Sequence, residues 1–441
     1  MKTESDIFFD DLYSEHIERA SFQYERRAGF PDDPELIWTD IYDFEEIFEA
    51  HIDALVIGEE PAIDICSVLA NEGDTGELHS AIVVFCRHKR IDLVEEIIDV
   101  LDFSDSERVK AVTDALCSEL SADLQAEFLM KLFDKGPAAI IIAASIIAYK
   151  RLNFENELLE SIAGYSSDKH ICLSIFYALG KTGSAKAEKP LLPFLENKDP
   201  DIVQAAISAL IRIGCLESLH EIPADLWPVI DLGLSWGKDS LPEIEKSDSM
   251  EEQKVLSMGL IGNISIIPDL IKSLSNEALS ENASLALNLI TGAELYEDHF
   301  IPEEIDEDAL FEDELEKHKK GELYAPGEEP GVTAIRTSQD TDAWQLWWDE
   351  NASNFNPETR YRNGKPYSPE CLIENLKSEK SPNIIRKLAY EELAIRYGIK
   401  APFETDMSVS QQISAIKELE KQIKAAPEFI EGRWYYNKKL I

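Results

Sequence analysis

The residues of this chain that could do chemistry are dispersed along it. Its 8 histidines and 6 cysteines include no HExxH helix and no CxxC pair, the spacings that bring zinc ligands together. No GxSxG, Walker or GxGxxG motif occurs either, so the sequence signs of a serine nucleophile and of a phosphate-binding loop are missing. The sequence therefore predicts no catalytic residue, no cofactor and no metal ligand, and it favours a protein that is not an enzyme.

Two short acidic runs, at residues 306–308 and 312–314, invite comparison with a calcium-binding loop. An EF-hand loop needs a glycine at its sixth position and a glutamate at its end, and this segment meets neither requirement. A solvated run of charges is the better interpretation, with weak and nonspecific association of cations as the alternative.

The best candidate for a functional site is a group of aromatic and basic residues near the C-terminal end. Its members are Trp344, Trp347, Trp348, Arg360 and Tyr361. Exposed tryptophans with an arginine and a tyrosine nearby are typical of the residues that dominate binding in protein interfaces. The competing interpretation makes the same aromatics the core of a small domain, since aromatic rings supply much of the core in small units.

The elements that would position these residues are helices repeated at a regular interval. Leu179 and Gly183 return as Leu210 and Gly214, an offset of 31 residues. A period near 30 filled with apolar residues at helical spacing is typical of stacked helical hairpins, each of which needs its neighbours to bury its apolar face. The sequence therefore predicts an all-α protein built as an α-solenoid, with one of its helices at residues 200–213. Solenoids mostly bind other molecules.

We expect four parts in the chain. They are an N-terminal helical cap at residues 1–58, a repeat solenoid at 59–293, an acidic linker at 294–339 and a small, mostly helical C-terminal domain at 340–441. Dense like charge and turn-forming residues predict that the linker is extended and mobile. In the C-terminal domain, Asn-Gly at 363–364 predicts a tight turn between two short strands. Glu392 and Arg396, four residues apart, predict a helix-face ion pair of small energetic weight.

The charge of the chain changes at the same boundary. Residues 1–339 carry 27 basic and 70 acidic side chains, whereas residues 340–441 carry 15 and 16, and the whole chain has a net charge of −44. A field of this sign repels phosphate backbones and anionic lipid head groups, so nucleic-acid and membrane partners are disfavoured and a basic protein partner is favoured. The alternative is that the acidity serves solubility or suits a salty habitat.

Cysteine usage and hydropathy predict a cytoplasmic protein. The six cysteines are scattered, and four of them lie at apolar helical positions as small buried hydrophobes, which suits a reducing compartment. The first dozen residues are acidic, unlike a secretory signal peptide. The longest apolar run, residues 137–149, is too short to cross a bilayer and predicts a buried helix.

Segments at both ends of the chain resemble a known family. The repeat units with Ala-Leu-Gly endings resemble HEAT repeats of the phycobilisome-lyase-like subtype, which implies a HEAT-like α-solenoid at residues 59–293. FEAHIDAL at 48–55, LITGAEL at 289–295 and the run from Trp347-Trp348 to Ser368-Pro369 are similar to a bacterial HEAT-like family linked to type VI secretion. This resemblance implies a cytoplasmic accessory of the secretion apparatus and no established activity. The long acidic linker departs from the family's pattern.

The leading hypothesis is a non-enzymatic, protein-binding accessory of a type VI secretion effector module. It would act as an effector immunity protein or a loading adaptor, and it would bind a basic secreted effector or its carrier on the concave face of the solenoid. Two alternatives stay open. One is a structural component of the secretion apparatus, and the other is a lyase-like enzyme of the repeat subtype, which would need a polar cluster lining a pocket.

Overall fold

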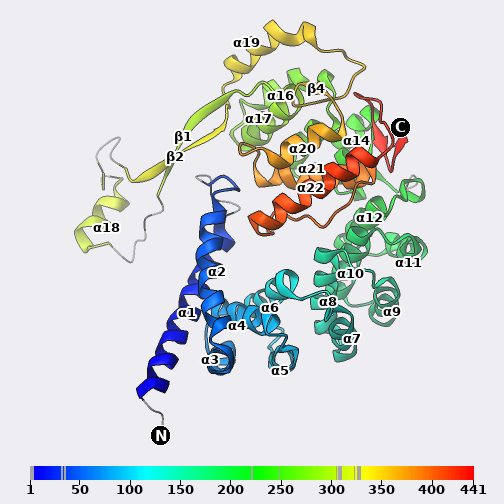
Figure 1. The fold of residues 1–441 in the computed structure, drawn as a ribbon. Helices are drawn as coiled ribbons and strands as arrows, with labels where there is room; N and C mark the ends of the chain where they lie inside the picture. The colour runs from blue at the N-terminus through cyan, green and yellow to red at the C-terminus, as the bar shows by residue number, and fades with distance from the viewer. Residues whose placement is uncertain are drawn as a thin grey trace.

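The computed structural model describes residues 4–30, 33, 36–219, 222–247, 249–303, 305, 310–321, 323–324 and 329–441. Helices dominate this part of the chain, and its strands form three small antiparallel pairs (Figure 1). The prediction of an all-α protein is confirmed. The acidic residues 306–308 lie outside the described residues.

Two helices form the N-terminal end of the molecule. α1 (Glu4–Gly29) and α2 (Ile41–Ile57) pack on each other, and α1 also packs on α3 (Glu59–Glu72) and α4 (Thr75–Arg87). Ile17 on α1 is fully buried in the core that these helices share. The N-terminal pair therefore covers the first helices of the array that follows.

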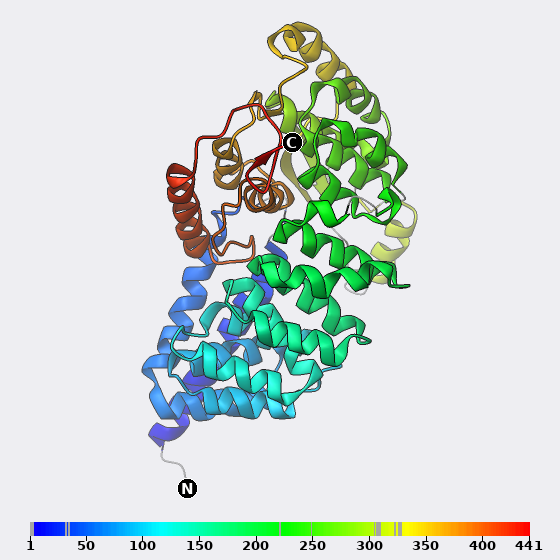
Figure 2. The same ribbon diagram turned by 90° about the vertical axis from the view of Figure 1, so that its right-hand side faces the viewer.

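From α3 to α17 the helices form an inner and an outer layer (Figures 1 and 2). We call the inner layer the inner row, and it consists of α4, α6 (Ser106–Glu119), α8 (Pro137–Lys150), α10 (Lys169–Thr182), α12 (Pro200–Ile213), α13 (Val229–Ser235), α15 (Glu251–Ile261) and α17 (Glu277–Thr291). Each helix of the inner row packs on the next one along the chain. The outer helices are α3, α5 (Ile91–Val100), α7 (Gln125–Lys135), α9 (Glu155–Tyr165), α11 (Glu188–Leu191), α14 (Leu241–Lys246) and α16 (Ile267–Ser273).

Short 3-10 turns connect or extend several of these helices. They are Ala185–Ala187, Leu192–Glu196, Leu216–Leu219, Ala224–Leu226, Lys238–Ser240, Ile264–Ile266 and, in the C-terminal domain, Ala352–Asn354. Between residues 185 and 196 the chain forms a single α-helical turn between two 3-10 turns. Pro190 and Pro193 interrupt it, because neither can donate the backbone hydrogen bond that a continuous helix needs.

Local sequence signals set the ends of the repeat helices. Gly183 follows α10 and Gly214 follows α12 with φ values of +72° and +102°, a region in which a side chain would be strained. α12 begins at Pro200, and the carboxylate of the preceding Asp199 accepts a hydrogen bond of 3.0 Å from the backbone N–H of Asp201. The bounds of α12 match the predicted helix at 200–213.

The C-terminal domain combines helices with two small strand pairs. It contains α19 (Thr341–Asn351), β3 (Tyr361–Arg362), β4 (Lys365–Pro366), α20 (Pro369–Lys377), α21 (Asn383–Tyr397), α22 (Val409–Ala425), β5 (Tyr435–Tyr436) and β6 (Lys439–Leu440). Asn363 and Gly364 join β3 to β4 with positive φ angles, as the Asn-Gly dipeptide predicts.

This domain lies within the curve of the inner row (Figures 1 and 2). α21 packs on α12 and α13, and Ile385, Leu388 and Ile395 of α21 belong to the same buried core as the row. Phe30 and Trp38, from the connection between α1 and α2, are buried in a second core with residues of α20, α21 and α22. The C-terminal domain, the row and the N-terminal helices therefore form one packed body.

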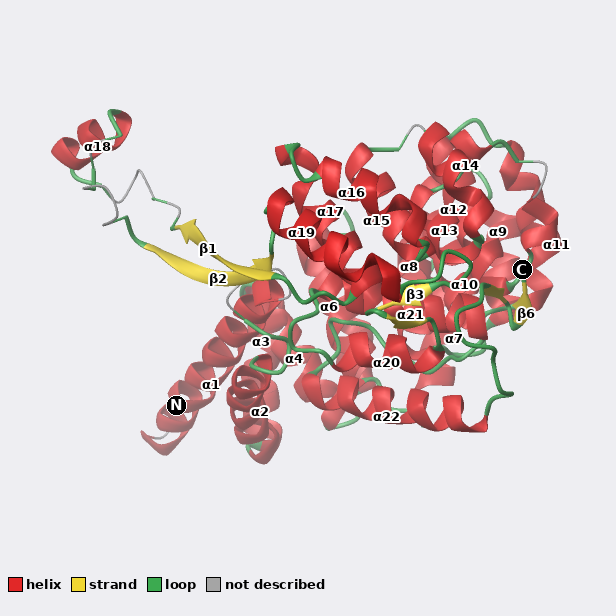
Figure 3. Ribbon diagram, turned by 90° about the horizontal axis from the view of Figure 1, so that it is seen from above, coloured by secondary structure: helices red, strands yellow, loops and turns green. Residues whose placement is uncertain are grey.

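The segment between α17 and α19 projects from this body as an arm (Figure 3). β1 (Tyr296–Pro302) and β2 (Gly331–Thr337) form an antiparallel ladder from the pair Tyr296–Thr337 to the pair Pro302–Gly331, and α18 (Glu312–Lys319) lies beyond it. The two ends of the expected linker are thus paired strands. The β2 residues GVTAIRT include several β-branched side chains, which favour a strand although charge dominates the segment as a whole.

Candidate functional site

The structure places the tryptophans of the predicted binding site in or against the core. Trp344 is 1% exposed, and its indole N–H donates a 2.7 Å hydrogen bond to the carbonyl of Ser338. Trp347 and Trp348 are half-buried, and their rings contact the ring of Phe355. The Trp344 side chain packs with α16 and α17, so the competing interpretation of these aromatics as core residues describes their positions.

Arg360 and Tyr361 are also buried, which contradicts the exposure that a binding hot spot requires. Tyr361 is 7% exposed, and its ring lies edge-on to Phe355 with centroids 4.8 Å apart. Arg360 is fully buried, because its guanidinium is drawn to the buried carboxylate of Glu392. Of the predicted site residues, only Trp347 and Trp348 are partly exposed to solvent.

Glu392 is the centre of a buried charge group that we call the Glu392 cluster. Its carboxylate accepts hydrogen bonds from Arg360 at 2.6 Å, from Arg362 at 2.8 Å and from the hydroxyl of Tyr367 at 2.7 Å. Arg396 lies 3.5 Å away, and all five residues are buried. The expected helix-face pair of Glu392 and Arg396 is therefore corrected to a pair in the interior, because α21 is covered by the inner row on one side and by α20 on another.

The Glu392 cluster joins the C-terminal domain to the inner row. The Arg360 guanidinium also donates to the carbonyl of Leu260 at 2.7 Å, and that of Arg396 donates to the carbonyl of Gly233 at 2.7 Å. Burial alone would raise the pKa of Glu392, but the three surrounding arginines lower it overall, so the carboxylate stays ionised.

A second set of charges recurs at the repeat interval on the inner row. Arg151, Lys181 and Arg212 follow one another at offsets of 30 and 31 residues, and we call them the basic column. Lys181 is 2.8 Å from Glu391 and 2.9 Å from Glu404, two acids of the C-terminal domain. Arg212 binds Glu391 at 2.8 Å, and Arg151 binds Glu404 at 2.7 Å. The sequence analysis did not predict this contact. The signal that could have revealed it is the spacing of three basic residues at the repeat interval in an otherwise acidic chain.

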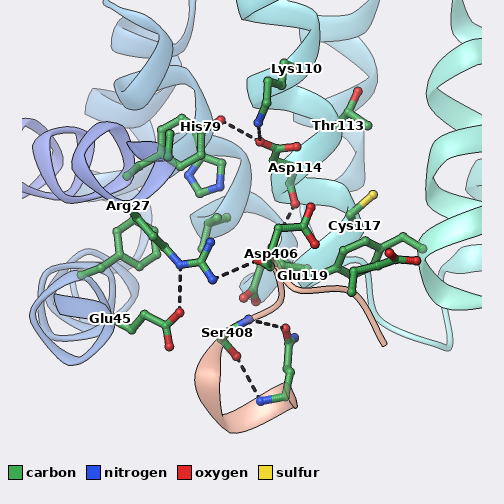
Figure 4. Close-up of a pocket in the computed structure, with 18 of the residues that line it drawn as sticks. Arg27, Glu45, His79, Lys110, Thr113, Asp114, Cys117, Glu119, Asp406 and Ser408 are labelled. Atoms are coloured by element: carbon green, nitrogen blue, oxygen red, sulfur yellow. Dashed lines mark hydrogen bonds and ion pairs between the residues drawn. The ribbon is translucent and has the colours of Figure 1, made fainter. Parts of the chain in front are cut away.

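Next to the basic column, a cavity of about 650 Å³ opens between the N-terminal helices, the inner row and the loop that precedes α22 (Figure 4). Its wall includes Tyr24, Arg27, Phe44, Glu45, Phe48, Glu49, His79, Lys110, Asp114, Cys117, Glu119, Tyr149, Tyr177, Lys387, Glu404 and Asp406. The volume suits a small molecule or the side chains of a peptide. The wall is polar on several sides and carries aromatic rings between its charges.

Arg27 holds the loop before α22 against the N-terminal helices. Its Nε donates to the carboxylate of Glu45 at 2.8 Å, and its Nη2 donates to the carbonyls of Asp406 and Met407 at 2.9 Å each. The same Glu45 accepts a 2.9 Å hydrogen bond from the backbone N–H of Val409. One side of the cavity is therefore built by residues nearly 400 positions apart.

His79 lies in the cavity wall as a neutral base. Its ring is 7% exposed and stacks on Tyr24 with centroids 3.8 Å apart and planes 13° apart. Burial, together with the positive charges of Arg27 and Lys110, lowers the pKa of His79 to about 3. The Nδ1 atom is buried without a hydrogen-bond partner in the described part of the chain. Such an atom is costly to leave unpaired.

Three carboxylates meet in the same cavity. Asp114 accepts a 3.0 Å hydrogen bond from Tyr24 and is contacted by Lys110, while Glu404 is bound by the basic column. Burial raises the pKa of Asp406, and the negative charges of Glu404 and Asp114 raise it further. The positive charge of Arg27 and a backbone hydrogen bond act against this rise.

The cavity wall brings charged, aromatic and hydrogen-bonding side chains together. Burial raises the pKa of the Cys117 thiol, so it stays protonated and is a weak nucleophile. Within the described ranges, no three histidine, cysteine, aspartate or glutamate side chains converge as a metal site would require. Sequence reasoning missed the cavity because its residues come from helices and a loop that are distant in the chain, with no local spacing to reveal them.

Neither a protein-family model nor a curated protein sequence matches this chain. In the described residues, no helix combines the length and the apolar character that crossing a bilayer demands. The candidate sites are therefore the cavity, the half-buried Trp347 and Trp348, and the acidic exterior of the helices.

Proposed function

We propose that this protein is a protein-binding accessory that holds a basic partner on its acidic helical surface. The observation that supports this proposal is the charge of residues 1–339, which carry 70 acidic side chains and only 27 basic ones. Exposed carboxylates extend along the array at Asp64, Glu72, Glu96, Glu107, Glu160, Glu217, Glu277 and Glu281. Such a surface speeds encounters with positively charged proteins and repels nucleic acids.

The partner would meet the outer side of the array. The concave face, where the sequence placed the partner, is occupied from α8 to α17 by the C-terminal domain. Trp434 and Tyr436, for example, donate hydrogen bonds of 2.9 Å to the carbonyls of Ile261 and Ile211 on the inner row. The outer helices and the exposed edges of the array keep their carboxylates available to a partner.

The resemblance at the two ends of the chain favours a type VI secretion effector module as the setting. There the protein would act in the cytoplasm as an effector immunity protein or as a loading adaptor. A nuclease effector would suit an acidic partner, because its active site must attract the phosphates of a nucleic acid. The carboxylates would then mimic the charge of DNA.

Affinity purification of the tagged full chain from its native host at low salt, with mass spectrometry, tests the proposal. We expect one stoichiometric, basic partner whose binding to the purified protein weakens steeply as salt rises. Recovery of the protein alone across growth conditions, or binding that is insensitive to salt, would contradict it. Co-sedimentation with sheath or baseplate particles would support the structural alternative instead.

A charge-neutralised variant locates the surface. Replacing Asp64 with Asn and Glu72 and Glu96 with Gln removes three charges from α3 and α5, and we expect the association rate to fall several-fold at low salt. The matched control replaces three exposed acids of the C-terminal end, Glu418, Glu428 and Glu431, with Gln. Equal effects of the two variants would show that net charge rather than this surface governs binding.

The polar cavity favours a second candidate function, the handling of a small ligand as in a lyase-like enzyme. The sequence hypothesis lacked a polar cluster lining a pocket, and His79, Asp114 and Asp406 supply one. An absorbance spectrum of freshly purified protein is the direct test. A bound chromophore would support this candidate, and a spectrum of protein alone would count against chromophore handling.

A further inference from the structure

The two strands of the arm are an incomplete sheet. β1 and β2 form a sheet of only two strands that projects from the body (Figure 3), and none of the three buried clusters of the described residues contains a side chain of either strand. A two-stranded ladder without a core is marginally stable in water, and a third strand or a covering surface stabilises it. The arm therefore offers a surface that a partner can complete.

One face of this ladder is open to solvent. The register places Asp298 directly opposite Ile335, and Phe300 follows two residues later on the same face. The Ile335 side chain is 71% exposed and that of Phe300 is 44% exposed. On the opposite face, Glu297 and Arg336 form an ion pair of 2.8 Å. The open face therefore combines two exposed apolar side chains with the exposed carboxylate of Asp298.

The outer edge of β1 directs backbone hydrogen-bonding groups into solvent. The N–H of Ser338 donates a 2.8 Å hydrogen bond to the carbonyl of Leu295, at the base of the ladder. Because hydrogen-bonded pairs alternate along an antiparallel ladder, the odd-numbered residues of β1 face β2 and the even-numbered ones direct their backbone groups outward. The outward N–H groups include those of Asp298 and Phe300. α17 packs on β2, so β1 has the more accessible edge.

The charge of the arm selects the kind of strand that this edge would accept. Residues 296–337 carry 14 acidic and 4 basic side chains, a net charge of −10, whereas the whole chain of 441 residues has a net charge of −44. The arm is thus more than twice as acidic per residue as the chain as a whole. Such a segment attracts a basic polypeptide and repels an acidic one.

We propose that the arm accepts a β-strand of a basic protein, which pairs with the outer edge of β1. Main-chain hydrogen bonds would provide affinity, and alternate side chains of the added strand would provide specificity. A basic side chain would lie beside Asp298 and an apolar one beside Phe300. This inference rests on the proposed function, because it names the segment of the protein that the basic partner pairs with.

Isothermal titration calorimetry of the full chain tests strand addition with two peptides of equal charge. One is acetyl-Lys-Val-Arg-Val-Lys-Val-Arg-amide, and the other has proline in place of each valine, which removes backbone donors and disfavours pairing in a ladder. We expect the valine peptide to bind at least fivefold more tightly. Equal affinities would show that charge alone governs binding and would overturn the proposal, as would failure of both peptides at millimolar concentration.

Two variants at one position separate the backbone of β1 from its side chain. Phe300→Ala and Phe300→Pro both remove the ring, but only the proline removes the outward N–H, and proline is tolerated at an edge position whose N–H faces solvent. We expect Phe300→Pro to bind the valine peptide at least threefold more weakly than Phe300→Ala. Glu428→Gln, an exposed position outside the arm, should keep the wild-type affinity. Thermal melts verify that the variants are folded. Equal affinities of the two Phe300 variants would contradict strand addition.

The proposed function and this inference fail in different ways. A purified basic partner that binds the wild type and Phe300→Pro equally would overturn the role of the arm and leave the proposed function in place. Failure to recover any basic partner would contradict the proposed function, and the two peptides would then decide alone whether the arm accepts a basic strand.

Discussion

At the scale of single residues, the protein places charge in its interior wherever two parts of the chain meet. Glu392 is surrounded by Arg360, Arg362 and Arg396, and Glu391 by Lys181 and Arg212. Taking these groups out of water is costly, and only close pairing offsets that cost. The pairing energy therefore offsets the desolvation cost only when every charged residue of such a group is present.

Glu392→Gln is expected to lower the free energy of unfolding by about 3–5 kcal/mol, because it leaves three buried guanidinium groups without their carboxylate. Urea denaturation of the variant and the wild type measures the difference. Glu374→Gln is the control, since Glu374 and Lys365 form an exposed ion pair of 2.7 Å. The control should change stability little. Equal stabilities of all three proteins would show that the Glu392 cluster contributes nothing to folding.

His79 predicts how stability responds to acid. The pKa of His79 is lowered from 6.5 to about 3 in the folded protein. Between these two pH values the imidazole is protonated in the unfolded chain and neutral in the folded one. Stability should fall by up to about 1.4 kcal/mol per pH unit from this residue as the pH drops toward 3.

Urea midpoints measured between pH 7 and 4 test this effect. His79→Phe should flatten the decline, whereas His170→Gln, at an exposed position, should keep the wild-type slope. An unchanged slope in His79→Phe would mean that other groups govern the response to acid.

At the scale of elements, small residues set how closely neighbouring helices of the inner row approach. A Cβ atom at Gly259 of α15 would lie 2.7 Å from the Cβ of Ala286 on α17, and one at Gly180 of α10 would lie 3.1 Å from the Cα of Ala209 on α12. The helices there pack almost backbone to backbone. Helix propensity therefore favours alanine at these positions, whereas the close packing of the helices requires glycine.

Gly259→Ala is expected to destabilise the protein by about 1–3 kcal/mol, because the new methyl group overlaps α17 and forces the helices apart. The matched change Gly164→Ala lies on α9, where no atom is within 4 Å of the new Cβ, and should stabilise by up to about 1 kcal/mol through helix propensity. Thermal denaturation compares the two variants. Stabilisation by both would mean that α15 and α17 separate without cost.

At the scale of the whole molecule, the inner row and the C-terminal domain depend on each other. The row presents the basic column to two acids of the domain, and residues of α21 complete the core of the row. An array of helical pairs is usually stabilised by neighbours alone, and its units can open separately. Here the domain links pairs that are distant along the row.

Native-state hydrogen exchange tests this linkage. The slowest amides of α12 and α21 should exchange with the same opening free energy, because the two helices share a core and the Arg212–Glu391 pair. Arg212→Ala should lower both values together. A lower opening free energy for α21 alone would show that the domain opens while the row stays folded.

The sequence by itself determined the helical elements and their repeat. Apolar spacing, Pro200 and Gly214 are local signals, and a helix can form from the properties of its own residues, so α12 lies where they predict it. The Asn-Gly turn at 363–364 is local in the same sense.

Only the tertiary structure decided which surfaces face solvent. Trp344 and Arg360 are buried because the C-terminal domain packs against the row, and β1 pairs with β2 across the 28 residues that separate the two strands. His79 and Asp406 share one cavity although more than 300 positions separate them. Contacts between residues so far apart in the sequence arise when elements that are already formed pack together. The local spacing of residues along the chain therefore does not predict them.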